Sequence, residues 1–235
     1  APNVSELFSD GVHHGAAAFE EGDQTLRSEK AYNTIASIRY SSDRLTLEVG
    51  GYYNYIRDYI YLRPQAEPVL TVRGAFPYFK YTQTNATFKG IDALAELKLS
   101  KQLAFTSKGT YLRVDDVQND SYLVMIPANR WENQLRYTRE ELGSWSRVSV
   151  SVGNRWVGQQ RLVPPNSDYL PPPPGYSLWN VQVGGVLALA NKKQLELTLT
   201  GENIFDTVYR DYLNRFRYFA DEMGRNVSLR ARWSF

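Results

Sequence analysis

The two histidines of the chain, His13 and His14, stand side by side, and Glu20, Glu21 and Asp23 follow shortly after them. Imidazole and carboxylate groups together suit zinc, iron or haem ligation. Neighbouring residues on a strand point to opposite faces, so both rings can serve one ligand only if this segment is a loop. The sequence therefore suggests a metal site formed by His13, His14, Glu20 and Asp23, with a solvated polar loop as the alternative.

A second group of candidates combines arginine with tyrosine beside two long connections of the chain. Tyr59 and Arg63 flank one connection, and Arg210, Tyr212 and Arg215 lie in another. Aromatic and guanidinium surfaces bind planar, anionic chelates through stacking and charge. Together with His13 and His14 they are the candidate ligand-binding residues of external loops; the alternative is ordinary anchoring at a membrane interface.

Composition argues against catalysis and against nucleic-acid binding. The chain has 235 residues, no cysteine and two adjacent histidines, and it lacks the glycine pattern of a nucleophile elbow. With 27 basic against 25 acidic residues, no electrostatic case for nucleic acid arises. We therefore expect no enzyme, no resident cofactor and no nucleic-acid partner.

Period-two alternation of apolar and polar residues dominates the chain and predicts β-strands. The last strand is the clearest, because Val227, Leu229, Ala231 and Trp233 alternate with polar residues. No run approaches the ~18 apolar residues of a membrane-spanning helix. Alternating segments are found at 26–41, 44–62, 90–99, 103–114, 129–139, 146–157, 176–190, 194–204 and 226–235.

Short and long connections alternate between these segments. Short turns are expected near 41–43, 100–101, 140–145 and 191–193, and long loops near 63–76, 115–128, 158–175 and 205–224. By the same order, residues 3–25 form an external loop. An up-and-down membrane barrel places all short turns on one side and all long loops on the other. We therefore expect an all-β, antiparallel, up-and-down transmembrane β-barrel, with a soluble β-sandwich as the alternative.

Aromatic residues and strand count refine this expectation. Tyrosines and tryptophans gather near the loop-proximal ends of the strands, including Tyr53, Tyr59, Tyr61, Trp131 and Trp156, as expected of an interfacial band. About nine strands are counted, whereas bacterial barrels have even numbers and cannot leave an open edge in lipid. The strands are therefore expected to belong to a larger barrel.

Several motifs give the chain a resemblance to a known family. Ala1-Pro2 with Glu6-Leu7, the strand start Gly90-Ile91-Asp92, Asn203-Ile204-Phe205-Asp206 with Tyr209, and Gly224 through the terminal Phe235 are the segments concerned. They resemble the C-terminal half of TonB-dependent outer-membrane receptors.

The resemblance implies a 22-stranded barrel in the outer membrane of a Gram-negative bacterium, closed by an N-terminal plug and energised through TonB. Residues 1–235 would then be the C-terminal part of the barrel, with the plug and the first half of the barrel absent from this chain. Phe235 would be the terminal aromatic that the barrel-insertion machinery reads.

The function implied is active import of a metal chelate, with a ferric siderophore as the first expectation. Haem or zinc uptake is the alternative within the family, since haem receptors carry a histidine in the interval that holds His13 and His14. The motif that should follow that interval reads Gly22-Asp23-Gln24-Thr25-Leu26 here, an imperfect match. A passive porin and a soluble β-barrel binding module are the alternatives from other classes.

Overall fold

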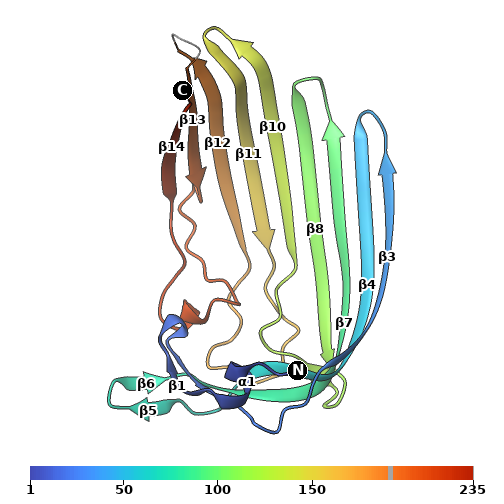
Figure 1. Ribbon diagram of the computed structural model, residues 1–235, viewed down its shortest axis with the longest axis vertical. Coiled ribbons are helices and arrows are strands. Elements are labelled where there is room, and N and C mark those ends of the chain that lie inside the picture. The colour runs from blue at the N-terminus through green and yellow to red at the C-terminus, as the bar shows by residue number, and fades with distance from the viewer. Residues whose placement is uncertain (190–192, 235) are drawn as a thin grey trace.

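A computed structural model describes residues 1–189 and 193–234 and shows a curved, antiparallel sheet (Figure 1). The nine long strands are β3 (Lys30–Ser41), β4 (Leu45–Pro64), β7 (Tyr78–Lys98), β8 (Leu103–Asp116), β10 (Arg130–Leu142), β11 (Trp145–Val157), β12 (Tyr176–Ala188), β13 (Gln194–Glu202) and β14 (Asn226–Ser234). The shorter elements are α1 (Val4–Phe8), β1 (Asp10–His13), η1 (His14–Ala16), β2 (Ala18–Glu21), β5 (Val69–Thr71), β6 (Gly74–Phe76), β9 (Ser121–Tyr122) and η3 (Arg215–Tyr218). No helix in the described ranges is long and apolar enough to cross a membrane.

The long strands follow one another through the sheet in chain order, each antiparallel to the next. The short turns gather at one end and the long loops at the other, which we call the loop end (Figure 1). The prediction of an up-and-down sheet with nine long strands is thereby confirmed. Within the described ranges, β3 and β14 each pair on one side only, so the sheet is a partial barrel.

The turn between β10 and β11 shows how the sequence sets the register. Leu142 and Trp145 are opposite one another, and Gly143 between them has a φ of 61°. A two-residue hairpin turn needs such left-handed conformations, which glycine adopts without strain. Lys193 belongs to the predicted turn at 191–193, whose other residues lie outside the described ranges.

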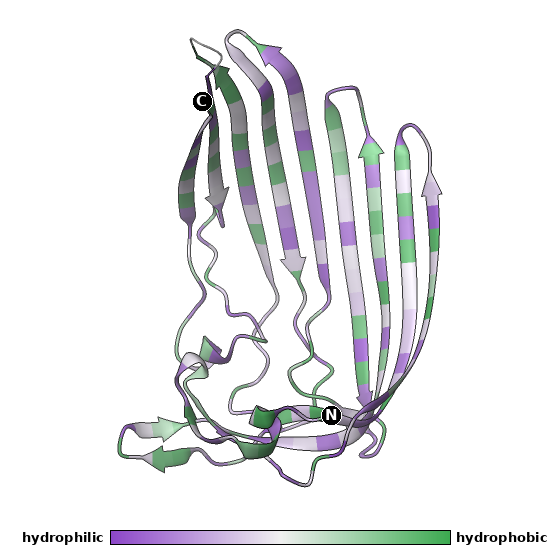
Figure 2. Cartoon of the chain, viewed as in Figure 1, coloured by the Kyte–Doolittle hydropathy of each residue, from purple (hydrophilic) through white to green (hydrophobic). Residues whose placement is uncertain are grey.

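The two faces of the sheet differ as the alternation predicts. One row across six strands is apolar and is exposed on five of them, and Figure 2 shows hydrophobic and hydrophilic bands alternating along the strands. This outer row contains Leu103, Tyr137, Val150, Val183, Leu199 and Leu229. The opposite, inner face is polar, and residues of the loops 158–175 and 203–225 share a cavity with Glu132 and Arg155 of this face.

Tyr59 and Tyr61 do not belong to the outer aromatic band that the alternation predicts. A bulge between Ile56 and Tyr59 shifts the register of β4 against β7. Both tyrosines then stack on the same side as Phe88 and pack on a buried cluster of Ala86, Val114, Leu123 and Ile126. One extra residue reverses which face a side chain meets, which period-two reasoning cannot detect.

Strand β7 begins at Tyr78, twelve residues before the predicted strand start at Gly90. Its first part runs across the loop end of the sheet, and the predicted loop 3–25 instead holds α1, β1, η1 and β2 (Figure 1). Strand β2 pairs in parallel with Tyr78–Lys80. We call β1, β2 and the Tyr78–Lys80 part of β7 the shelf.

Helix α1 packs on the chain that follows β2. Asn3 and Glu6 form a capping box, in which each side chain accepts a hydrogen bond from the other residue's backbone N–H. Gly22 donates its N–H to the Ser9 carbonyl oxygen at 2.7 Å, and a Cβ at Gly22 would lie 2.6 Å from backbone atoms of Leu7 and Phe8. Only glycine fits this contact.

We therefore predict that Gly22→Ala loosens the N-terminal segment by about 1–3 kcal/mol, because backbone atoms must move apart. Limited trypsin digestion followed by mass spectrometry should show faster cleavage at Arg27 and Lys30. Gly15→Ala is the matched control, since its Cβ would meet only the His13 ring, at 3.6 Å. Equal cleavage of both variants would contradict the prediction.

Candidate functional site

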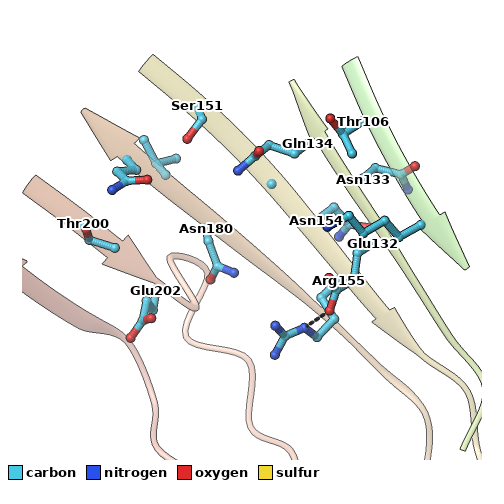
Figure 3. A pocket seen from close by; sticks show the side chains of 14 residues that line it. Thr106, Glu132, Asn133, Gln134, Ser151, Asn154, Arg155, Asn180, Thr200 and Glu202 are labelled. Carbon is cyan, nitrogen blue, oxygen red and sulfur yellow. Dashed lines mark hydrogen bonds and ion pairs between the residues drawn. The ribbon is translucent and has the colours of Figure 1, made fainter. Parts of the chain in front are cut away.

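A polar pocket of about 270 Å³ lies on the inner face between β8 and β13 (Figure 3). Side chains of amides and hydroxyls dominate its lining, including Gln134, Ser151 and Asn180. Glu132 and Arg155 face one another in register and form an ion pair at 2.7 Å. Such a wall offers hydrogen bonds to a hydrated, polar ligand.

A larger cavity of about 780 Å³ lies at the loop end, between β4, the residues around β9 and the loop 158–175. Tyr61 and Arg63 line it from β4, and Asp168 and Tyr169 line it from the proline-rich loop. The side chain of Arg63 is exposed, and it forms no ion pair within residues 1–189 and 193–234. A free guanidinium beside a tyrosine can bind a carboxylate or a planar anionic group.

A smaller cavity of about 190 Å³ leads from the loops toward the inner wall. Three arginines reach it, Arg130 and Arg155 from the sheet and Arg210 from the loop 203–225. Arg155 pairs with Glu132, and Arg210 pairs with Asp221 at 2.5 Å. Arg130 has no ion-pair partner in the described part of the chain. The geometry leaves Arg130 available to an anion.

Arg217 and Asp168 form a buried ion pair that joins the loops 203–225 and 158–175. The two side chains are 2% and 6% exposed. Asp168 also accepts a hydrogen bond from the Tyr218 hydroxyl at 2.6 Å. The Arg217 guanidinium lies 4.9 Å from the Tyr212 ring centre and 4.7 Å from that of Tyr218. We call these four residues the latch.

The Arg217–Asp168 pair at the centre of the latch is almost fully buried. Burial raises the pKa of the Tyr218 hydroxyl, and its hydrogen bond to Asp168 raises it further. Tyr218 therefore remains a neutral donor at physiological pH. The Nε of Arg217 has no hydrogen-bond partner among the described residues, so the guanidinium is held by Asp168, by the two rings and by a hydrogen bond that it donates to the Pro171 carbonyl oxygen at 3.4 Å.

Further contacts fix the latch to the shelf. Arg215 pairs with the buried Glu20 of β2 at 2.6 Å and lies 5.6 Å from the ring centre of Phe79. Tyr169 accepts a hydrogen bond from the Tyr78 N–H at 2.8 Å. These contacts join segments that are distant in sequence: Arg217 and Asp168 are 49 residues apart, and Arg215 and Glu20 are 195 residues apart.

The metal site suggested by the sequence is not gathered in space. His13 and His14 are exposed, and His14 lies 3.2 Å from an Arg73 nitrogen. Glu20 is buried against Arg215, while Asp23 accepts bonds from the hydroxyl and N–H of Thr25, which lower the pKa of its carboxyl group. No group of three or more histidine, aspartate or glutamate residues suited to a metal ion occurs in the described ranges.

The other sequence candidates fall into two groups. Arg210 and Arg215 form ion pairs, and Tyr212 belongs to the latch. Tyr59 packs inside the aromatic cluster of β4. Of these candidates, only Arg63 faces an open cavity and has no ion-pair partner in the described ranges. The membrane-insertion candidate Phe235 lies outside the described residues.

Asp168 and Tyr169 were not identified from the sequence. Their loop carries prolines at 164–165 and 171–174, and this composition suggests stiffness without indicating a partner. Glu21 was named only beside the metal candidates. It accepts hydrogen bonds from Lys80 and Tyr78, and the first of these lowers the pKa of its carboxyl group most. Parallel pairing of β2 with β7 brings these residues together, and the local sequence contains no pattern that predicts this pairing.

Comparison with known proteins agrees with this architecture. Residues 1–204 match the family model described as TonB dependent receptor-like, beta-barrel. No curated protein matches the sequence. Because the family model covers most of the chain, the chain belongs to the TonB-dependent receptor β-barrel family.

Solved structures share the fold at low sequence identity. The copper transporter OprC is 20% identical with a TM-score of 0.71, over 99% of this chain and 34% of that one. A mutant of the ferric enterobactin receptor PfeA from Pseudomonas aeruginosa is 17% identical with a TM-score of 0.64, over 100% and 36%. The siderophore receptor PirA from Acinetobacter baumannii is 16% identical with a TM-score of 0.62, over 93% and 33%. This chain therefore spans about a third of the length of each.

We predict that Arg217→Met destabilises the loop end by about 3–5 kcal/mol, because it leaves Asp168 buried without its charge partner. Hydrogen exchange should become faster in residues 158–175 and 203–225. Arg225→Gln in the same loop is the control, since its pair with Asp206 is 3.9 Å long and more than half exposed on both sides. That pair is worth at most about 1 kcal/mol. Unchanged exchange in Arg217→Met would show that the latch does not hold the loops.

Proposed function

We propose that this chain forms the C-terminal part of an outer-membrane receptor that imports a metal chelate, with a ferric siderophore as substrate and TonB as the source of energy. A plug domain and further barrel strands, supplied by other parts of the same polypeptide, complete the transporter. Family membership supports the proposal, as do the neighbours, whose names describe copper, iron and siderophore transport.

The observation that supports the substrate class is that two arginines beside the loop-end cavities have no ion-pair partner among residues 1–189 and 193–234. Arg63 and Arg130 line two separate cavities, each of which also has tyrosine and amide side chains in its lining. Hydroxamate, catecholate and carboxylate chelates present negatively charged oxygens, which guanidinium groups bind with paired hydrogen bonds. An anionic chelate therefore suits this loop end.

Uptake of radioactive iron tests the proposal directly. We expect the full-length protein, expressed in a Gram-negative host without other siderophore receptors, to import iron from at least one ferric siderophore, and uptake to stop when the tonB gene is deleted. A large, steady ion conductance of the protein in planar bilayers, together with TonB-independent uptake, would instead indicate a porin. Solubility without detergent would indicate the soluble binding module.

For the ligand contact, we predict that Arg63→Gln weakens binding of the transported ferric siderophore about tenfold or more, because a charge-assisted hydrogen bond is lost. Fluorescence quenching of the detergent-solubilised receptor measures the affinity. Arg44→Gln removes the same charge at the short-turn end and should leave the affinity unchanged. Equal affinities for both variants would remove Arg63 from the ligand site.

Haem or zinc uptake is retained as a second candidate because His13 and His14 are both exposed at the loop end. If the receptor takes up a ferric siderophore, His13→Ala/His14→Ala should leave its affinity for that substrate unchanged. Titration of haem and zinc against the same double variant separates the candidates. A loss of haem or zinc binding would favour the second function and would assign the histidines to the ligand.

A further inference from the structure

Glu132 and Arg155 belong to the lining of two cavities of the inner face at once. They line the pocket of about 270 Å³ between β8 and β13, and they also line the cavity of about 190 Å³ that leads from the loops. Figure 3 shows the two side chains next to one another, joined by the ion pair at 2.7 Å. A ligand that passes from one cavity to the other therefore meets this pair.

Cations surround Glu132 in the register of the sheet. Arg155 of β11 and Lys108 of β8 are its direct partners on the two neighbouring strands. Side chains that are directly opposite in an antiparallel sheet have Cβ atoms about 4.5–5.5 Å apart. Arg130 lies two positions away on β10, on the same face and about 7 Å along the strand. Three cations are therefore within side-chain reach of one carboxylate.

The positive charge around Glu132 is only partly compensated. Of the three cations, only Arg155 has an ion-pair partner in the described part of the chain, so Lys108 and Arg130 have none there. The other acids that line either cavity are Glu202 on β13 and Asp211 in the last long loop. This part of the wall thus offers two further cations to an anionic ligand.

The Glu132–Arg155 pair is itself weak and incomplete. The two side chains are 40% and 51% exposed, and water screens such a pair. Arg155 donates to Glu132 through its Nε alone, and its other guanidinium nitrogens form no hydrogen bond with the described residues. A carboxylate that replaces Glu132 can bind the guanidinium with two parallel hydrogen bonds, which is the stronger geometry.

We propose that Glu132 occupies Arg155 as an internal competitor and that a carboxylate of the incoming ferric chelate displaces it. The substrate class is then a ferric hydroxycarboxylate chelate, whose further carboxylates pair with Lys108 and Arg130. Glu132 determines specificity, because a chelate without carboxylates leaves the pair intact and gains no charge pairing from the wall. This inference rests on the proposed function and names the chemistry of its substrate.

Titration of ferric citrate against the full-length receptor in detergent tests the exchange. Glu132→Gln should strengthen binding about three- to tenfold, because the internal carboxylate no longer competes for Arg155, whereas Arg155→Gln should weaken binding about tenfold. Glu132→Gln/Arg155→Gln should bind as Arg155→Gln does, since a competitor matters only while its partner is present. Glu202→Gln is the matched control, because it removes the same charge from the same pocket without freeing a guanidinium.

An uncharged ferric trihydroxamate, which has no carboxylate, is the second probe, and its affinity should be the same for Glu132→Gln and for the unmodified receptor. A gain of equal size in Glu202→Gln or with the trihydroxamate would overturn the exchange. Unchanged or weaker binding of ferric citrate by Glu132→Gln, or no binding of ferric citrate by the receptor, would also overturn it.

Uptake of radioactive iron separates this inference from the proposed function. TonB-dependent import from the trihydroxamate alone would leave the transport function standing and overturn the carboxylate class. Absence of import from every ferric siderophore, together with the expected gain of ferric citrate binding in Glu132→Gln, would overturn the transport function and support the exchange.

Discussion

Backbone N–H and C=O groups in hydrocarbon can find partners only on a neighbouring strand, because lipid offers none. In this chain that requirement explains the order of the strands, since each long strand pairs antiparallel with the next along the sequence. It also explains why half of each strand is polar: once the ladder is complete, the side chains alone decide which face meets lipid and which meets water. The outer apolar row and the polar pocket of the inner face are two results of the same pairing.

At the loop end, side-chain contacts join distant segments in addition to the backbone pairing of β2 with β7. Arg217, Arg215 and Arg210 have each found a carboxylate, in Asp168, Glu20 and Asp221. The first pair joins the two loops, the second joins the loop 203–225 to the shelf, and the third lies within that loop, so three guanidinium groups already have carboxylate partners. Arg217 is buried and Arg215 and Arg210 are partly buried in their ion pairs, whereas Arg63 is exposed and has no ion-pair partner among the described residues.

Local signals were enough to predict the strands, their faces and the side on which the long loops gather, because alternation and turn residues such as Gly143 act within a few positions. They failed where distant segments meet. The bulge between Ile56 and Tyr59 turns Tyr59 inward, and Asp168 meets Arg217 across 49 residues. Among the candidate residues, Arg63, Arg210, Tyr212 and Arg215 line cavities or form contacts at the loop end, but the sequence alone does not show which of them already have partners.

The parallel contact between β2 and the start of β7 divides the mouth of the barrel into unlike halves. On one side, a hydrogen-bonded ribbon lies across the loop end, and displacing it would break backbone bonds at Phe19 to Glu21 together. On the other side, beside β10 to β13, the chain is irregular and is held by side-chain contacts such as the Arg217–Asp168 pair, together with isolated backbone hydrogen bonds such as the one from the Gly158 N–H to the Asn129 carbonyl oxygen. The loop end thus combines a part fixed by strand pairing with a part fixed mainly by side chains.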